Sequence, residues 1–366
     1  MKKRSIITLL TLCLAASPFA FAGNSEVKNS QQSTLKYIEF TQLGNPAEVL
    51  QVKTATKQAL QAGEVRVSVL AAPINPSDLL QIAGKYGVDP VLPSNPGSEG
   101  VGRVLETSAE VKHLAVDQLV LLVGGSTWRN EIVAPASSFL PLPNLGPLDS
   151  EVIEQLAMAT VNPISALLML TSFVELKEGQ WLVQSAANSA VGGYIIQLAK
   201  QRGIKTINVV RREGLAEDLM AKGADVVLID GPDLAAQIAS ATGNMPVALA
   251  IDAVGGDTYS RLASSLGFGG TLVAYGKLSG KDTTLDTAMT IFNDISLRGF
   301  WLSKWFEAAS REQQMAAFGQ IIPLIASGAL AANVDSRFSV DDIKQAVTRA
   351  VQRGRNGKVL IVPNAK

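Results

Sequence analysis

The sequence predicts an α/β protein in which a β-rich domain and a doubly wound parallel-sheet domain share one chain. Three observations carry this prediction. Short runs with a period of two, broken by prolines, fill residues 34–159, and strands alternate with helices over 160–303. Residues 304–366 then end in an amphipathic helix and a strand. Alternation of strands and helices at this spacing indicates right-handed βαβ units and a parallel sheet covered on both faces.

Residues 34–159 are expected to form short strands joined by loops. Val65, Val67 and Val69 alternate with polar or small residues, which is the period of a strand. Eight prolines between Pro73 and Pro143 interrupt the chain and exclude long helices there. The sequence therefore predicts a β-rich, partly closed domain for this part of the chain.

The remaining elements follow from apolar runs and their spacing. The expected strands are 181–184, 206–210, 226–229, 247–251, 271–275 and 358–362, and the expected helices are 191–199, 215–222, 312–325 and 341–353. We therefore predict one domain from residues 23–159, completed by 304–366, with a second domain, 160–303, inserted between its two parts.

Composition and charge exclude several function classes. The chain has 366 residues with 32 basic and 32 acidic side chains, so no global field favours nucleic acid. One histidine, His113, and one cysteine, Cys13, are too few for a zinc site, an iron–sulfur cluster or a disulfide framework. Catalysis by a serine or cysteine triad would depend on His113 alone.

The first 22 residues have the pattern of a secretory signal peptide. Lys2, Lys3 and Arg4 precede an apolar run from 6 to 16, and Ala20-Phe21-Ala22 offers a cleavage site. The apolar run is shorter than the ~20 residues that span a bilayer, so we expect no membrane span in the mature chain. The pattern predicts an exported, periplasmic protein that begins at Gly23.

A cofactor site is indicated where the first strand of the second domain meets its helix. Aligned with the dinucleotide-binding fingerprint, the three glycine positions hold Ala187, Ser189 and Gly192, which are small enough to let backbone N–H groups approach a pyrophosphate. The following strand ends in Arg211-Arg212 rather than in an acidic residue, which favours the 2′-phosphate of NADPH. The alternatives are an ordinary strand–helix turn and a solvated basic pair.

Several short motifs together resemble one family. They are Ile74-Asn75-Pro76-Ser77-Asp78, Gly84-Lys85-Tyr86-Gly87, Thr127-Trp128-Arg129, Val161-Asn162-Pro163, Ala186-Ala187-Asn188-Ser189 and Gly299-Phe300-Trp301-Leu302-Ser303. With these motifs the chain resembles the zinc-independent medium-chain dehydrogenases/reductases, most of all the mitochondrial-type 2-enoyl thioester reductases. The resemblance implies a GroES-like catalytic domain and a Rossmann NADP-binding domain.

The resemblance also implies roles for individual residues. Tyr86 matches the tyrosine that delivers a proton to the α-carbon after NADPH delivers hydride to the β-carbon. The positions that match cofactor contacts are Asn162, Asn188, Ser189, Ala190, Val191, Gly192, Arg211, Arg212, Glu213, Tyr275, Gly276, Lys277, Leu278, Phe300, Trp301, Leu302, Ser303 and Lys358. Where zinc-dependent relatives hold metal ligands, this chain has Asn75-Pro76-Ser77-Asp78 and Gly97-Ser98-Glu99-Gly100, so no metal is expected.

The implied activity is NADPH-dependent reduction of a 2-enoyl thioester or related activated alkene. Two alternatives stay open: NADPH-dependent quinone reduction, and an exported scaffold that keeps the fold without turnover. Tyr86 could be a plain loop residue, and Trp301 could be a core residue. Asp78 and Glu99 are interpreted as structural hydrogen-bonding groups. The family often dimerises through its Rossmann sheet edges, which implies a homodimer.

Overall fold

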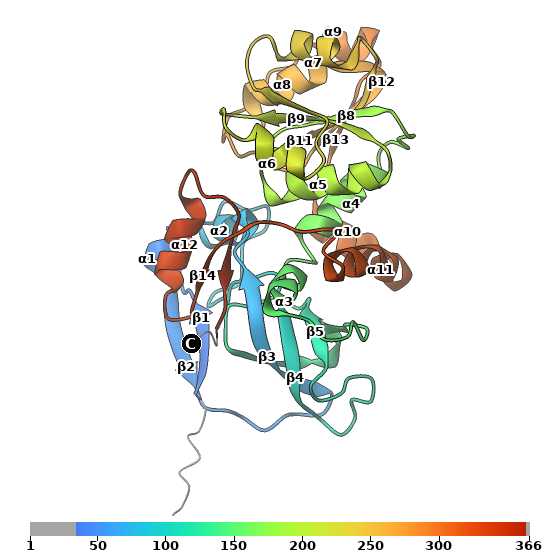
Figure 1. Ribbon diagram of the computed structural model, residues 1–366. Coiled ribbons are helices and arrows are strands. Elements are labelled where there is room, and N and C mark those ends of the chain that lie inside the picture. The colour runs from blue at the N-terminus through green and yellow to red at the C-terminus, as the bar shows by residue number, and fades with distance from the viewer. Residues whose placement is uncertain (1–33, 364–366) are drawn as a thin grey trace, which may run out of the picture. The chain divides into compact units, whose positions relative to one another are not determined.

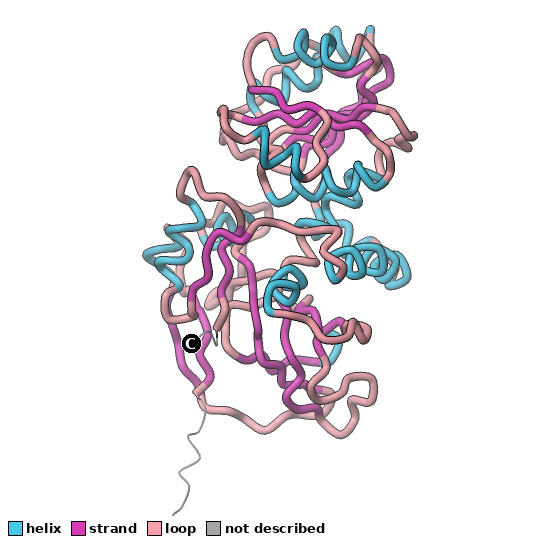
Figure 2. Tube along the Cα trace, in the orientation of Figure 1, coloured by secondary structure: helices cyan, strands magenta, loops and turns pink. Residues whose placement is uncertain are grey.

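A computed structural model describes residues 34–363 of the chain. Within these residues the strands form a two-stranded, a six-stranded and a seven-stranded sheet, which Figure 2 shows in magenta. The expected signal peptide, residues 1–22, lies outside the described residues. The α/β fold class is confirmed, with a GroES-like part and a Rossmann-type part.

The Rossmann-type sheet is parallel throughout, in the strand order β10-β9-β8-β11-β12-β13. Its strands are β8 (Trp181–Gln184), β9 (Lys205–Val210), β10 (Val226–Ile229), β11 (Val247–Asp252), β12 (Leu266–Ala274) and β13 (Ser296–Gly299). The order reverses between β8 and β11, which places a switch point at their carboxyl ends. Ligands of open α/β sheets bind outside such a point.

Helices cover both faces of this sheet. They are α4 (Asn162–Thr171), α5 (Ala190–Gln201), α6 (Ala216–Ala221), α7 (Leu234–Thr242), α8 (Gly256–Ser264) and α9 (Thr287–Phe292). Figure 1 shows α5 and α6 on one side of the strands and α7 and α8 on the other. Val183 and Ile207 on adjacent central strands are fully buried, as strands covered on both faces require.

The GroES-like part is built on the sheet with the order β14-β15-β3-β4-β5-β7, with β6 also paired to β3. Its strands are β3 (Glu64–Pro73), β4 (Val101–Thr107), β5 (Leu119–Leu122), β6 (Glu131–Pro135), β7 (Phe139–Pro141), β14 (Val334–Phe338) and β15 (Lys358–Ile361), with β1 (Leu35–Glu39) and β2 (Gln51–Ala55) paired separately. Because β15 pairs antiparallel with β3, residues 358–361 join the sheet that is otherwise built mainly from residues 64–141. Val65, Val67 and Val69 are fully buried in β3.

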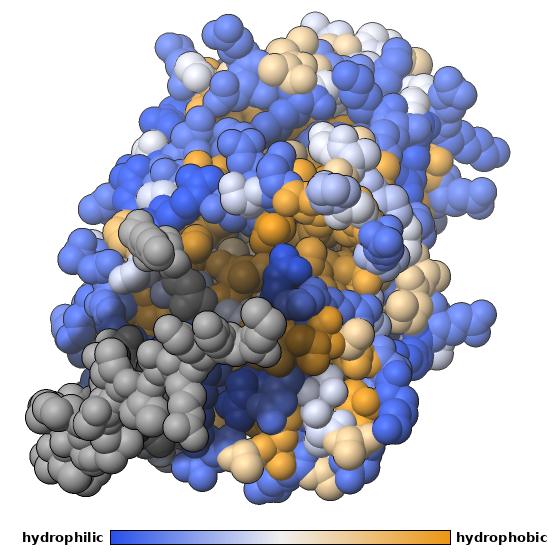
Figure 3. All heavy atoms as spheres, turned by 60° about the horizontal axis from the view of Figure 1, so that its bottom comes forward, coloured by the Kyte–Doolittle hydropathy of each residue, from blue (hydrophilic) through white to orange (hydrophobic). Residues whose placement is uncertain are grey.

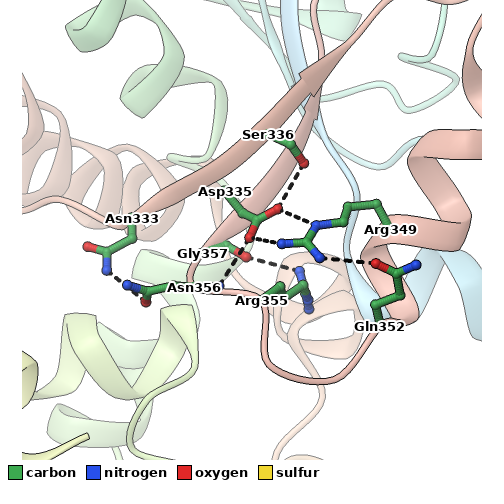
Figure 4. Close-up of polar contacts among 8 residues, drawn as sticks. All are labelled: Asn333, Asp335, Ser336, Arg349, Gln352, Arg355, Asn356 and Gly357. Carbon is green, nitrogen blue, oxygen red and sulfur yellow. Dashed lines mark hydrogen bonds and ion pairs between the residues drawn. The ribbon is translucent and has the colours of Figure 1, made fainter. Parts of the chain in front are cut away.

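The other helices are α1 (Pro46–Val49), α2 (Pro76–Ile82), α3 (Ser150–Ala157), α10 (Leu302–Ala308), α11 (Arg311–Ala326) and α12 (Ile343–Val351), with a short 3-10 turn over Ala136–Ser138. Figure 4 shows how α12 is held to β14. The Arg349 guanidinium of α12 donates to both carboxylate oxygens of Asp335 on β14, at 2.6 and 2.8 Å. These hydrogen bonds hold the pKa of Asp335 at about 2.

Apolar side chains also reach the surface. Figure 3 shows hydrophobic residues gathered in patches among hydrophilic ones on the face drawn. The largest exposed fractions include Phe268 at 80% and Phe292 at 75%. Of the helices in the described part of the chain, none is by itself long and apolar enough to cross a membrane; α3 and α4 pass that test only as a pair bent by 59°.

Candidate active site

Tyr86 lies in the loop after α2, and its hydroxyl contacts the residue that begins α10. The Trp301 Nε1–H donates a hydrogen bond to the Tyr86 Oη at 2.8 Å. The two rings are nearly perpendicular, at 87°, with centroids 5.7 Å apart. An indole N–H can only donate, so the phenol oxygen is the acceptor and the phenol proton stays available for a third group.

The glycines on both sides of Tyr86 have steric reasons. Gly84 has φ +66°, in the left-handed region that favours glycine. A Cβ at Gly87 would lie 3.1 Å from Cη2 of Trp301, so a side chain there would press on the indole ring. The Gly-Lys-Tyr-Gly motif thus shapes the loop and leaves room for Trp301.

Five buried polar residues form a second part of the site, here called the amide–ion cluster: Asn75, Asp78, Glu99, Asn162 and Lys358. Each is less than 10% exposed. The Asn75 Oδ1 accepts hydrogen bonds from Asn162 Nδ2 at 3.0 Å and from Lys358 Nζ. The Asn75 Nδ2 donates to Glu99 Oε1 at 2.8 Å, and the Asn75 backbone N–H donates to Asp78 Oδ2 at 2.8 Å. Asn75 therefore links two residues that were expected to contact the cofactor.

Burial shifts the pKa values of the ionisable groups in the cluster. The second oxygen of Glu99 accepts the backbone N–H groups of Thr160 and Val161 at 3.0 and 2.7 Å. Burial raises the pKa of Glu99 to about 7 and the pKa of Asp78 to about 6. Burial lowers the pKa of Lys358 to about 8. The hydrogen bonds of both carboxyl groups agree with the structural role expected for them.

The turn from β8 to α5 presents a helix N-terminus at the switch point. The Ser189 Oγ caps the helix by accepting the Gly192 N–H at 3.1 Å. A Cβ at Gly192 would lie 2.4 Å from the Ala187 carbonyl oxygen, so only glycine fits there. Free N–H groups at a helix N-terminus attract phosphate, and this turn therefore fits the pyrophosphate of a dinucleotide.

Arg211 and Arg212 follow β9 directly and are exposed, as is Glu213. Within residues 34–363 neither arginine forms an ion pair or donates a side-chain hydrogen bond. Two unpaired guanidinium groups at the end of the second strand fit the 2′-phosphate of an NADP-type cofactor.

The remaining expected positions lie in the loops after β12 and β13, in the turn before α5, and in the first turns of α5 and α10. Tyr275, Phe300, Leu302, Ser189 and Ala190 are half-buried, Val191 is buried, and Gly276, Lys277, Leu278, Ser303 and Asn188 are exposed. Lys277 is engaged with Asp282 at 2.6 Å. Burial raises the pKa of the Tyr275 hydroxyl, which the Ser189 side chain approaches. The expected positions thus lie in the turn before α5, at the end of β9, in the segments after β12 and β13, and in the amide–ion cluster.

Asn75 is the residue that sequence reasoning left without a role. Its motif did carry one signal, because an asparagine followed three residues later by an acid is a capping pattern, and Asn75 caps α2 with Asp78. The partners that make it a hub lie 24, 87 and 283 positions away. No local pattern could have indicated them.

The amide–ion cluster does not suit a zinc ion. Asn75, Asp78 and Glu99 lie in the two stretches where the resemblance places the ligands of zinc-dependent relatives. The Lys358 ammonium group donates to Asn75 and would repel a metal cation there. Among residues 34–363 no group of three or more His, Cys, Asp or Glu side chains could hold a metal.

Two family descriptions match the chain. Residues 61–144 match the alcohol dehydrogenase GroES-like domain, and residues 190–319 match the zinc-binding dehydrogenase family. Among curated proteins, the mitochondrial enoyl-[acyl-carrier-protein] reductase of Rattus norvegicus is 35% identical, over 88% of this chain and 87% of its own. The Caenorhabditis elegans enzyme of the same name is 36% identical over 84% and 90%.

Solved structures give the same picture. The complex of Etr1p with NADP and crotonyl-CoA is 28% identical with a TM-score of 0.81, and a heterodimer of mitochondrial 2-enoyl thioester reductases from Candida tropicalis is 29% identical with 0.81. A protein from Bacillus thuringiensis assigned as an NADPH:quinone reductase is 30% identical with 0.81. Each comparison covers 90% of this chain and 99% of the other.

The comparisons contradict the periplasmic location expected from residues 1–22. The rat and nematode relatives, and further ones from human and Dictyostelium discoideum, are described as mitochondrial. A basic segment with three cations and no acidic residue is a composition that mitochondrial transit peptides share with secretory signals, so the pattern did not discriminate between them.

Proposed function

The chain belongs to the medium-chain dehydrogenase/reductase superfamily and is homologous to mitochondrial enoyl thioester reductases; from this premise we propose that it reduces the carbon–carbon double bond of 2-enoyl thioesters with NADPH. The observation that carries the proposal is the hydrogen bond from Trp301 to the Tyr86 hydroxyl. It fixes a neutral proton donor while leaving its proton free.

The cofactor side of the site supports NADPH. The β8–α5 turn with its Ser189 cap would hold the pyrophosphate, and Arg211 with Arg212 would hold the 2′-phosphate. When bound, NADPH supplies the hydride that adds to the β-carbon of the substrate. We propose that the other positions inferred from the resemblance line the same site, with Asn162 and Lys358 acting through Asn75.

Tyr86 would complete the reduction. Hydride addition at the β-carbon places negative charge on the α-carbon and the thioester oxygen. The Tyr86 O–H bond breaks as a C–H bond forms at the α-carbon, and the phenolate oxygen that remains accepts the Trp301 N–H. Water then returns a proton to Tyr86. The indole N–H would stabilise the phenolate more than the neutral phenol, because hydrogen bonds to charged groups are stronger.

A second candidate, NADPH-dependent quinone reduction, is favoured by the likeness to the Bacillus thuringiensis protein. The two functions are separated by comparing kcat/KM for crotonyl-CoA and for a benzoquinone at saturating NADPH. We expect crotonyl-CoA to be the better substrate by at least tenfold. A preference for the quinone would assign the protein as a quinone reductase. No turnover of either substrate would favour the hypothesis of a scaffold without catalytic activity.

We also propose the domain division 23–159 with 304–366 and 160–303. It is supported by β15, which adds residues 358–361 to the sheet of the first part. A homodimer is proposed through β13, because this strand forms an exposed edge of the Rossmann-type sheet and all four of its residues are exposed. Unpaired edges with apolar neighbours such as Phe268 and Ile291 favour pairing with a second copy.

A further inference from the structure

Arg129, in the GroES-like part, carries a charge that nothing around it neutralises. Its guanidinium forms no ion pair and donates no hydrogen bond within the described part of the chain. Its Nε is fully buried and without a partner, and burial lowers the pKa of Arg129. The one compensating contact is the Tyr37 ring, whose centroid lies 5.6 Å from Cζ. Arg129 as a whole is half-buried, but its Nε has lost contact with water without gaining an acceptor, and this unsatisfied donor suggests an anionic ligand.

The guanidinium lines a cavity of about 230 Å³, here called the Arg129 pocket, between the loop after β5 and strand β6. Arg129 is the only charged residue among its lining residues. Among the other lining residues, the backbone N–H groups of Gly124 and Gly125 and the Ser138 hydroxyl have no hydrogen-bond partner within residues 34–363. These groups could donate to an anion that the arginine holds.

Other side chains that line the pocket are apolar. Leu122, Ile132 and Phe139 line the pocket and are each less than 7% exposed. The volume corresponds to about eight liquid waters at ~30 Å³ each, which suits a ligand of few non-hydrogen atoms and excludes a nucleotide. A ligand that satisfies both the polar and the apolar lining groups has one charged end and a short apolar chain.

We propose that the Arg129 pocket binds a small aliphatic carboxylate of about four to six carbons. The guanidinium fork would receive the two carboxylate oxygens, as this geometry does in bidentate pairs. Gly124, Gly125 and Ser138 would donate to the remaining lone pairs, and the alkyl chain would cover Leu122 and Phe139. A phosphate fits less well, because its further oxygens would be pressed against the apolar wall.

The site is separate from the proposed catalytic residues. Neither Tyr86, Trp301 nor any member of the amide–ion cluster lines the Arg129 pocket. The proposal therefore does not depend on the proposed reduction, and each can fail without the other.

The test is a titration of the whole protein with sodium butyrate, followed by the Arg Nε–H resonances in ¹H–¹⁵N spectra. The resonance missing from Arg129→Gln identifies Arg129, and it should shift with butyrate in a saturable, one-site manner. Calorimetry should show at least tenfold weaker binding in Arg129→Gln, about 1.4 kcal/mol. Arg103→Gln, which removes the same charge from β4 outside the pocket, should bind as the unmutated protein does.

Ser138→Leu keeps the arginine and fills the cavity, so it should also abolish binding if Arg129→Gln proves unstable. n-Butanol and inorganic phosphate test the two halves of the ligand. An unmoved Arg129 resonance, equal binding by Arg129→Gln and Arg103→Gln, or butanol binding as tight as that of butyrate would overturn the proposal. Phosphate binding that depends on Arg129, without butyrate binding, would overturn the carboxylate assignment.

Discussion

Trp301 donates its indole N–H to the hydroxyl of Tyr86 across 215 positions of sequence, at 2.8 Å. The two residues come from different parts of the chain, Tyr86 from the loop after α2 and Trp301 from the start of α10. The contact orients the hydroxyl of a loop tyrosine, which the proposed reduction would use as its proton donor.

Tyr86→Phe should separate the two candidate reactions. The change removes only the hydroxyl and keeps the ring against Trp301, so folding and NADPH binding should persist. Turnover of crotonyl-CoA should fall by roughly 10²–10⁴, the usual contribution of a positioned general acid. The rate of quinone reduction should fall little, since the oxygens of the reduced quinone can take protons from water.

The control is Tyr259→Phe, which removes a hydroxyl from α8 and should leave both rates unchanged. The informative quantity is the ratio of the two losses in one preparation of Tyr86→Phe. Unchanged crotonyl-CoA turnover would remove Tyr86 from the mechanism.

Trp301→Phe should impair the same step more mildly. It keeps an aromatic ring but removes the N–H that the Tyr86 oxygen accepts. We expect kcat to fall about tenfold, or 1.4 kcal/mol, with KM nearly constant. Trp305→Phe on the same helix should change neither. A KM effect alone would indicate that Trp301 only packs against the substrate.

Cofactor choice should depend on the unpaired arginines. Since Arg211 and Arg212 end β9 without an acidic partner, NADPH should bind at least tenfold more tightly than NADH, about 1.4 kcal/mol. Replacing both by alanine should erase the preference and leave NADH affinity almost unchanged. Arg353→Ala, at another exposed site, serves as the control; equal binding of NADPH and NADH by the unmutated protein contradicts the assignment.

The proposed dimer makes a prediction about the exposed edge. Phe268→Glu with Ile291→Glu would place charges on β12, which pairs with β13, and on α9, which precedes it, where they would repel those of a second copy. Light scattering after gel filtration should show a dimer before the change and a monomer after it. Val91→Glu, at a residue 88% exposed in the GroES-like part, should not alter the mass. A monomeric unmutated protein would rule the dimer out.

Sequence reasoning found the elements that are buried apolar runs. The bounds expected for β8 and β10 coincide with those in the structure, because each is a short, mainly apolar run bounded by turn residues; β8 is buried, whereas β10, at the edge of the sheet, is only half-buried. The expected helix 341–353 is α12 with both ends shortened by two residues. Element ends fray, and such differences are ordinary.

Strand β14 was missed because its reasons lie elsewhere in the chain. Its sequence, Val-Asp-Ser-Arg-Phe, has a charged residue at its second position and another at its fourth. Asp335 is paired with Arg349 on α12, and Arg337 with Glu154 on α3, both at 2.6 Å. Strand β13 was also unexpected, since all four of its residues are exposed.

For the candidate site, too, local patterns predicted residues within one unit of the fold but not the contacts between distant segments. The turn before α5 and the arginines after β9 could be predicted, because both lie within one βαβ unit. The Tyr86–Trp301 contact and the amide–ion cluster could not be derived from local pattern, because each joins residues from separate elements. Resemblance supplied Tyr86 and Lys358, but it did not indicate that Lys358 would donate to Asn75.

The amide–ion cluster should make stability depend on pH in an unusual direction. Because the pKa of Glu99 is raised from 4.5 to about 7, the folded protein keeps a proton that the unfolded chain releases above pH 4.5. The resulting stabilisation is present at low pH and is lost as pH rises through 7. Asp78, raised from 3.8 to about 6, acts in the same direction. Lys358, lowered from 10.5 to about 8, restores stability as pH rises from 8 towards 10.5.

Urea unfolding at a series of pH values should therefore show a decline in stability from pH 5 to pH 7 that is smaller in Glu99→Gln. The variant should also be less stable at every pH by about 1–3 kcal/mol, because a buried amide N–H₂ would face the N–H groups of Asn75, Thr160 or Val161 without an acceptor. Glu217→Gln, at an exposed position on α6, controls for the loss of one carboxyl group and should keep the full decline. An equal decline of stability with pH in Glu99→Gln and in the unmutated protein would contradict this prediction. It would mean that Glu99 is ionised throughout this range, stabilised by the charge of Lys358 and by the three N–H groups that donate to Glu99.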